Sequence, residues 1–218
     1  MLRMENTSTW AQEVVDRVLQ LRQGLGRSVS VGISGVDCAG KTTLAEAVHI
    51  LLQSSGVCSV LIPGDEFTRP TADRYRNADE GVGYYLDSFD YSHLFEEILP
   101  AVRNNVAGEM IMKVSDWEKD SWRDEPLVLA ADGAVIVEGC FLFADQRAQE
   151  FDLSVWIELP LASVVNRALR RPRDLERMGG PTGVQERYEA RYIPGQVIHL
   201  ERDMPAKRAT LVLKASYE

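Results

Sequence analysis

The sequence has few of the residues that cross-link or anchor a protein. Its three cysteines, Cys38, Cys58 and Cys140, are odd in number and far apart in a chain of 218 residues. This pattern predicts reduced, buried thiols, and argues against a disulfide framework or a metal cage. The start, MLRMENTSTW, lacks the apolar core of a signal peptide. No stretch approaches the ~18 apolar residues that a membrane span needs, so we expect a cytoplasmic protein.

Basic charge is also in short supply. The chain has 24 Lys and Arg against 33 Asp and Glu, which gives a formal net charge of −9. As a whole it therefore does not attract a nucleic-acid backbone or an anionic membrane, and any polyanion needs a local site. Hydrophobic residues make up 45% of the chain and charged residues 26%. These fractions are typical of a globular protein, and we expect residues 1–218 to form one domain.

Short apolar runs that alternate with helical patterns indicate an α/β fold. The runs lie at residues 28–34, 57–62, 134–137, 153–158 and 209–213. Because most are apolar on both faces, they predict a parallel sheet covered by helices. The helical patterns lie at residues 42–53, 92–106, 162–171 and 184–192. Residues 1–26 predict an N-terminal amphipathic helix from about Ser8, with Thr9 and Gln12 as a capping box.

Two segments break this alternation. Residues 68–88 are polar and aromatic and contain glycine, and they are too long for an ordinary connection. We expect them to be functional or mobile. Residues 110–130 contain two short β-like runs on either side of SDWEKDSWRDEP, which predicts a β-hairpin that stands on the main sheet.

Residues 35–42, GVDCAGKT, match the phosphate-binding pattern G-x-x-x-x-G-K-[ST] between a predicted strand and a predicted helix. The glycines let the backbone curl so that its N–H groups point at phosphate oxygens. Lys41 would reach the β- and γ-phosphates, and the hydroxyl of Thr42 would bind Mg²⁺. The alternative is a glycine-rich turn with an exposed lysine. The residues expected at the nucleotide are Gly35, Val36, Asp37, Cys38, Ala39, Gly40, Lys41, Thr42 and Thr43.

Two carboxylates follow predicted strands. Asp65 lies just past the second apolar run, and Glu138 ends the third. Ligands of an open parallel sheet bind beyond the carboxyl ends of its strands, so both carboxylates would face the crevice that holds the phosphate loop. Glu138 would hold the metal, and Asp65 would accept a proton from an attacking hydroxyl. The alternatives are a turn cap for Asp65 and a solvated strand end for Glu138.

Arginine is concentrated late in the chain. The cluster consists of Arg167, Arg170, Arg171, Arg173 and Arg177. It could close over a triphosphate and stabilise charge during phosphoryl transfer. The alternative is a solvated helix face paired to Asp174 and Glu176. Arg187 and Arg191, four residues apart on the next helical pattern, would either contribute from a neighbouring position or be surface charges.

Five stretches carry a likeness to a known family: VGISGVDCAGKTTLA, GDEF, the FD of DSFDYSHL, VIVEG and RALRRPRD. Over about residues 29–213 the sequence resembles the phosphoribulokinase and uridine kinase family. The resemblance implies a P-loop NTPase fold with a five-stranded parallel sheet flanked by helices, a β-hairpin over the acceptor and an arginine-bearing lid at residues 167–183. It implies ATP and Mg²⁺ at Lys41 and Thr42, Asp65 as the catalytic base and Glu138 at the metal. The implied lid residues are Arg167, Arg170, Arg171 and Arg173, with Arg171 counted among the catalytic groups.

The acceptor side departs from the uridine kinase pattern. That pattern is F-D-H-P-x-A-F-D, and its first aspartate holds the ribose hydroxyls. YYLDSFD places Tyr84 at that position, which leaves Asp87 or Asp90 as a substitute. Trp117 keeps an aromatic residue in the hairpin and would either stack on a ring or cap the hairpin's hydrophobic face. The expected substrate contacts are Asp65, Tyr84, Asp87, Asp90 and Trp117.

The sequence as a whole predicts an ATP-dependent kinase that transfers the γ-phosphoryl group to a hydroxyl of a small metabolite. A nucleoside such as uridine is one candidate acceptor; pantothenate-, nicotinamide riboside- and sugar-like compounds are others. The rival functions are a regulatory module that hydrolyses a nucleoside triphosphate and a nucleotide-binding scaffold without chemistry. We expect neither a nucleic-acid nor a membrane partner, and a homo-oligomer stays open.

Overall fold

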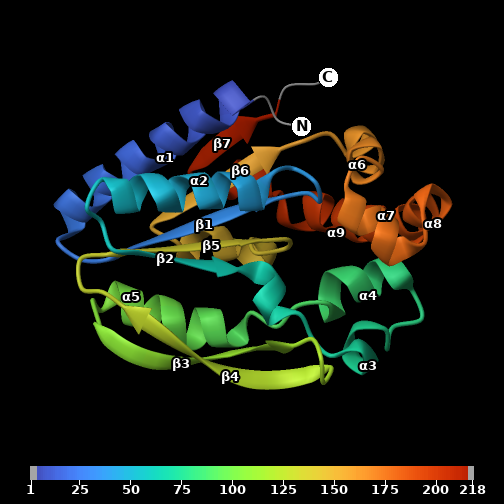
Figure 1. Cartoon of the computed structure of the whole chain (residues 1–218), viewed down its shortest axis with the longest axis horizontal. Helices are drawn as coiled ribbons and strands as arrows, with labels where there is room; N and C mark the ends of the chain where they lie inside the picture. The colour runs from blue at the N-terminus through green and yellow to red at the C-terminus, as the bar shows by residue number, and fades with distance from the viewer. Residues whose placement is uncertain (1–3, 216–218) are drawn as a thin grey trace.

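A five-stranded parallel sheet forms the centre of the molecule, as expected from the sequence (Figure 1). The structure is a computed structural model and describes residues 4–215. Its strands follow the order β2-β5-β1-β6-β7. They are β1 (Val29–Gly35), β2 (Ser59–Pro63), β5 (Ala134–Gly139), β6 (Leu153–Glu158) and β7 (Leu211–Lys214). Each strand bound lies within two residues of the predicted one.

The register of the central strands brings three carboxyl ends together. β1 and β5 are buried along their whole length, because helices cover both faces of the sheet. Ser34 pairs with Gly139, and Pro63 pairs with Glu138. The segments that follow β1, β2 and β5 therefore begin side by side at one edge of the sheet.

Two layers cover the sheet. α1 (Met4–Leu25) and α2 (Lys41–Ser54) lie together on one face, and α5 (Leu99–Arg103), preceded by a π-helical turn at Leu94–Ile98, lies on the other (Figure 1). The predicted capping box is wrong: α1 extends back to Met4, so Thr9 lies inside the helix. Gln12 instead donates a hydrogen bond to Asp16 at 2.8 Å.

The predicted hairpin is present as β3 (Gly108–Asp116) and β4 (Ser121–Leu129), which pair antiparallel. Val114 of β3 and Leu127 and Leu129 of β4 are buried. The hydroxyl of Ser115 donates to the carbonyl of Glu66 at 3.0 Å. This bond ties the hairpin to the segment after β2, so the hairpin and the candidate base Asp65 keep a fixed relation.

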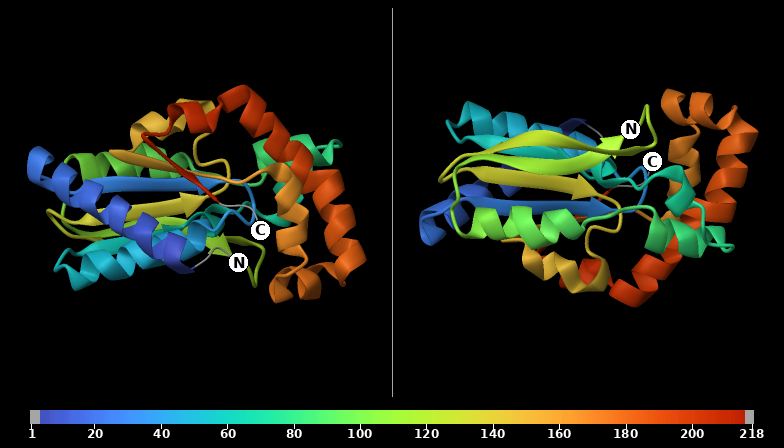
Figure 2. Two further views of the ribbon diagram at one scale, coloured as in Figure 1. Left: turned by 90° about the horizontal axis from the view of Figure 1, so that it is seen from above. Right: turned by 90° about the horizontal axis from the view of Figure 1, so that it is seen from below.

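A cluster of helices lies beyond the carboxyl ends of the strands (Figure 2). It consists of α3 (Thr71–Arg74), α4 (Glu80–Asp87), α6 (Leu161–Ala168), α7 (Pro172–Met178), α8 (Pro181–Arg187), a π-helical turn at Tyr188–Tyr192 and α9 (Ile193–Asp203); α10 (Pro205–Arg208) precedes β7. The sequence did not predict α3, α4, α7, α9 and α10. Gly195 lets α9 approach α4 closely, since an added Cβ there would lie 2.8 Å from the carbonyl of Gly81.

The three cysteines are free thiols, but the expectation that they are buried is wrong for Cys58, which is exposed. Cys38 and Cys140 are partly buried. Among residues 4–215, no helix combines the length and the apolar character needed to cross a membrane.

An ion pair at the other end of the sheet joins β1 to β6. Arg27 binds Asp152 through two hydrogen bonds of 2.9 and 2.7 Å, and the backbone N–H and hydroxyl of Ser30 donate to the same carboxylate at 2.9 and 3.0 Å. Burial favours the neutral acid, but the bonds from Arg27 and Ser30 outweigh it and hold the pKa of Asp152 below its ordinary value of 3.8.

We predict that Asp152→Asn lowers the free energy of unfolding at neutral pH by about 2 kcal/mol, because charge-assisted hydrogen bonds to a half-buried carboxylate are lost. A depressed folded-state pKa contributes stability above pH 3.8, and this contribution disappears as the pH falls through the folded-state value. Urea denaturation should therefore show a gap between wild type and variant that is constant at neutral pH and closes in acid. Glu13→Gln, in an exposed pair with Arg17, is the control and should change stability by less than about 0.5 kcal/mol. A gap that persists unchanged below pH 3 would contradict the assignment.

Candidate functional site

The phosphate loop connects β1 to α2. Gly40 and Cys38 adopt left-handed backbone conformations with φ of 101° and 60°. These conformations turn the chain tightly before Lys41, where glycine is the favoured residue and cysteine is rare. The Lys41 side chain is 9% exposed, and its Nζ donates to the carbonyls of Gly35 and Val36 at 3.1 and 3.0 Å. The alternative of an exposed lysine on a turn is therefore wrong.

Negative groups compensate the charge of Lys41. Burial alone would lower the pKa of its ammonium, but the neighbouring carboxylates of Asp37 and Glu138 oppose this, and the pKa lies above its ordinary value. Lys41 therefore stays fully charged, as a group that binds phosphate oxygens must.

Thr42 and Glu138 form a pair of oxygen donors beside the loop. The Thr42 hydroxyl donates to Oε1 of Glu138 at 3.0 Å. Glu138 is 6% exposed, so the alternative of a solvated strand end is wrong. Burial raises the pKa of its carboxyl, although Lys41 and Thr42 partly oppose this. No three His, Cys, Asp or Glu side chains among the described residues could hold a metal together, but Mg²⁺ commonly takes one or two protein oxygens and completes its shell with phosphate and water. Thr42 and Glu138 fit that role.

Asp65 lies in a 3₁₀ turn at Gly64–Phe67, directly after β2. No side-chain cap bond forms at this turn, and the exposed Asp65 carboxylate makes no hydrogen bond or ion pair with any other described residue. Gly64 brings the turn against β5: an added Cβ would lie 2.6 Å from the carbonyl of Glu138. Asp65 is therefore free to meet a ligand, and its turn packs directly on the strand end that carries Glu138.

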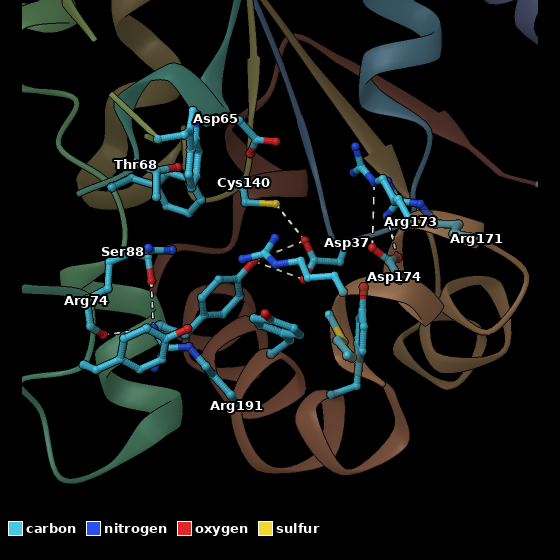
Figure 3. Close-up of a pocket in the computed structure, with 18 residues that line it drawn as sticks. Asp37, Asp65, Thr68, Arg74, Ser88, Cys140, Arg171, Arg173, Asp174 and Arg191 are labelled. Atoms are coloured by element: carbon cyan, nitrogen blue, oxygen red, sulfur yellow. Dashed lines mark hydrogen bonds and ion pairs between the residues drawn. The ribbon is translucent and has the colours of Figure 1, made fainter. Parts of the chain in front are cut away.

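A cleft opens between the phosphate loop, the 3₁₀ turn, the hairpin and the helical cluster (Figure 3). Its lining consists of Asp37, Asp65, Thr68, Arg74, Tyr75, Tyr84, Ser88, Phe89, Trp117, Cys140, Arg171, Arg173, Asp174, Arg177, Met178, Tyr188, Arg191 and Tyr192. Asp65, Tyr84 and Trp117, expected at the substrate, are therefore brought together. Asp87 and Asp90 are not: Asp87 pairs with Arg76, and Asp90 pairs with Arg69 at 3.2 Å.

The arginine-rich segment lies over the phosphate loop. Arg167 donates to the carbonyl of Cys38 at 3.3 Å, and Arg171 donates to Sγ of Cys38 at the same distance. Arg171 and Arg173 also pair with Asp174 at 3.2 and 3.7 Å, as the alternative of a helix face paired to Asp174 expected. Arg170 is exposed and does not line the cleft. Thr43, also expected at the nucleotide, is exposed at the start of α2.

Sequence reasoning missed a polar network at the floor of the cleft. The Asp37 carboxylate accepts hydrogen bonds from the Tyr84 hydroxyl at 3.1 Å and from the Cys140 thiol at 2.9 Å. The Asp37 N–H donates to Oε1 of Gln196, which is buried in α9. Cys140 directly follows VIVEG and could have been found from that position. Gln196 carried no signal, because α9 itself was not predicted.

No protein-family model matches the chain. It is 27% identical to the uridine kinase of Borrelia duttonii (strain Ly) over 151 residues, which cover 68% of each chain. It is 24% identical to the uridine kinase of Mycoplasma pneumoniae (strain ATCC 29342 / M129 / Subtype 1) over 180 residues, 81% of each chain. The chain resembles uridine kinases.

Solved structures agree on the fold. A possible uridine kinase from Bacillus stearothermophilus superimposes with a TM-score of 0.67 at 22% identity, covering 92% of this chain and 99% of that one. D-glycerate 3-kinase from Cryptococcus neoformans var. grubii superimposes with a TM-score of 0.60 at 13% identity, covering 85% and 87%. The fold is that of P-loop kinases, and the resemblance stated from the sequence motifs is confirmed.

We predict that Cys140 reacts with a thiol reagent at least about tenfold more slowly than the exposed Cys58 at mildly alkaline pH. Burial, followed by the charge of Asp37, raises the pKa of the Cys140 thiol well above its ordinary value, so its thiolate fraction is small. Mass-resolved labelling with iodoacetamide measures both rates in one sample. Asp37→Asn should accelerate Cys140 and leave Cys58 unchanged, whereas equal acceleration of both would indicate general loosening and contradict this account.

Proposed function

We propose that the chain is a kinase that transfers the γ-phosphoryl group of ATP to a hydroxyl of a small molecule. One observation carries the proposal: the unpaired carboxylate of Asp65 opens into the same cleft as the arginine lid and the floor of the phosphate loop. A protein that only binds or slowly hydrolyses a nucleotide has no need of a free base at that position. The resemblance to uridine kinases supports the same chemistry.

The nucleotide half of the site consists of the phosphate loop and the lid. Main-chain N–H groups of the loop and the start of α2 would bind phosphate oxygens, while Lys41 supplies a fixed positive charge. Thr42 and Glu138 would hold Mg²⁺, which when bound neutralises charge on the transferring phosphoryl group. Arg167 and Arg171 already lie against Cys38 of the loop, so they would reach the same phosphates with little movement.

The acceptor half consists of Asp65 and the residues that orient a hydroxyl toward it. Asp65 accepts the proton of that hydroxyl as the oxygen attacks phosphorus. The turn that carries Asp65 is held on one side by Gly64 against Glu138 and on the other by the bond from Ser115 to Glu66. Phosphoryl transfer depends mostly on positioning and charge, so this rigidity matters as much as the base itself.

We predict that Asp65→Asn lowers turnover with an accepted hydroxyl compound by about 10²–10⁴-fold, the usual contribution of a general base. Affinity for an ATP analogue should stay within about twofold, since Asp65 does not contact the phosphate loop. Transfer from radiolabelled ATP gives the rate, and calorimetry gives the affinity. Glu66→Gln removes the adjacent carboxylate, which does not line the cleft, and serves as the matched control. Full turnover of Asp65→Asn would remove Asp65 from the mechanism.

We predict that Lys41→Met weakens binding of a nonhydrolysable ATP analogue by at least about tenfold, because a buried, charge-assisted contact to phosphate is lost. Arg103→Met, which removes an exposed cation of α5 paired with Glu150, is the control for a general effect of charge. Equilibrium dialysis measures both dissociation constants. Unaltered retention of the analogue by Lys41→Met would show that residues 35–42 do not hold a triphosphate.

A further inference from the structure

A positively charged wall lies on the side of the cleft away from the lid. Figure 3 shows Arg74, Ser88 and Arg191 on one side and Arg171 and Arg173 on the other. We call Arg74, Ser88 and Arg191 the acceptor wall. A molecule whose hydroxyl meets Asp65 while its donor phosphate lies under the lid would extend toward this wall.

Arg191 in the acceptor wall is a buried cation without a carboxylate partner. It is 2% exposed, and its donors bind neutral oxygens: the carbonyls of Glu80 and Arg74 at 3.2 and 2.9 Å and the hydroxyl of Ser88 at 3.1 Å. No ion pair among the described side chains includes Arg191, and the carboxylate of Glu80 is directed to Arg187 at 3.0 Å. Burial, together with the charge of Arg187, lowers the pKa of Arg191. A buried charge without a counter-ion lowers the stability of the folded protein because it has lost its hydration, and a bound anion beside it would offset this loss.

Arg74 presents a second incompletely bonded guanidinium. Its guanidinium carbon lies 5.7 Å from the ring centroid of Tyr75 and 5.6 Å from that of Trp117. One Nη donates to the hydroxyl of Thr71 at 3.0 Å, while the buried Nε has no hydrogen-bond partner among the described residues. The carboxylate of Asp120 lies 3.9 Å from an Nη of Arg74 and already accepts a hydrogen bond from the N–H of Thr71. A guanidinium held by aromatic rings keeps its edge available for an oxygen anion.

The carboxylates that line the cleft do not neutralise this wall. They are Asp37, Asp65 and Asp174. Asp37 accepts hydrogen bonds from Tyr84 and Cys140. Asp174 forms ion pairs with Arg171 and Arg173. Asp65 is needed for the reacting hydroxyl. The far part of the cleft thus offers hydrogen-bond donors and positive charge, which match a ligand rich in anionic oxygens better than a neutral one.

We propose that the hydroxyl acceptor carries an anionic oxygen group, a carboxylate or a phosphate, that binds at the acceptor wall while its hydroxyl lies at Asp65. The inference rests on the proposed kinase function and narrows its substrate class. The edge of Arg74 contacts the anion directly, and Arg191 acts behind it as a fixed charge. Uridine, which is neutral, lacks the group that this wall selects.

The first test compares matched compounds that differ in the anionic group: glycerate with glycerol, and ribose 5-phosphate with ribose, with uridine as a further neutral compound. Calorimetry with Mg²⁺ and a nonhydrolysable ATP analogue gives affinities that do not depend on turnover. We expect the anionic member of a pair to bind at least about tenfold more tightly than the neutral member. Equal binding within both pairs, or tighter binding of uridine than of either anion, would overturn the proposal.

The second test uses the minimal probes acetate and inorganic phosphate, with the analogue filling the phosphate loop. One or both should raise the melting temperature of the wild type, and the two probes distinguish a carboxylate site from a phosphate site. Arg74→Met should lose the shift and Arg74→Lys should restore part of it. Arg123→Met, which removes an exposed hairpin arginine outside the cleft, should keep it in full.

The outcomes separate this inference from the proposed function. If the wild type binds the analogue but shows no shift with either probe, or if Arg74→Met keeps the shift as Arg123→Met does, the anionic acceptor is refuted and the kinase is not. If the analogue itself does not bind, the proposed function is refuted and this inference falls with it.

Discussion

The close packing of three strand ends is the constraint on which the site depends. Parallel pairing puts Ser34 of β1 opposite Gly139 of β5, and Pro63 of β2 opposite Glu138. The chain then turns directly from β2 into the segment of Asp65, which is possible because Gly64 has no side chain to collide with the Glu138 carbonyl. The phosphate loop, Glu138 and Asp65 thus come from distant parts of the sequence and meet without any long connection having to place them.

The positive side chains in the two halves of the cleft are compensated by carboxylates to different extents. On the phosphate-loop side, Lys41 lies among Asp37 and Glu138, so its charge is compensated before any ligand arrives. On the acceptor wall, Arg191 has neutral oxygens and aromatic faces around it. The difference has a physical consequence: a polyanionic nucleotide must compete with Asp37 and Glu138 for Lys41, whereas an anion at the wall competes with the exposed Asp120, which lies 3.9 Å from Arg74.

The sequence was most informative where one local pattern specifies one local structure. The five strands could be predicted because continuous apolar runs have few other uses in a chain of this composition. The phosphate loop could be predicted because its glycines and Lys41 have fixed positions relative to a strand and a helix. Asp65 and Glu138 followed from their place at strand ends. In each case the signal lies within about ten residues of the feature.

The features that the sequence did not predict depend on contacts between distant segments. α9 escaped prediction because Pro194 and Gly195 look like a helix end, although Pro lies in its first turn and Gly195 serves its approach to α4. α4 escaped prediction because its buried residues are glycine, tyrosine and Asp87, which do not form an aliphatic helical pattern. Asp87 and Asp90 were plausible substrate residues on sequence grounds, but the fold gives each an arginine partner, Arg76 and Arg69. No local pattern could have indicated that Arg191 would be buried without one.

The lid and the phosphate loop are coupled through Cys38. Its left-handed conformation directs its thiol to Arg171 at 3.3 Å and to the Tyr188 hydroxyl at 3.6 Å, and its carbonyl accepts from Arg167. A triphosphate that binds the loop offers the same arginines far stronger acceptors than a thiol or a carbonyl. Binding of the nucleotide would therefore redirect Arg171 from Cys38 and weaken its hold on Asp174, one of whose buried oxygens has no hydrogen-bond partner among the described residues. Because α7 carries both Arg173 and Asp174, this exchange would move the helix that also lines the cleft through Arg177 and Met178. A bound nucleotide would thereby change the shape of the acceptor half of the cleft as well as the charge balance of the nucleotide half.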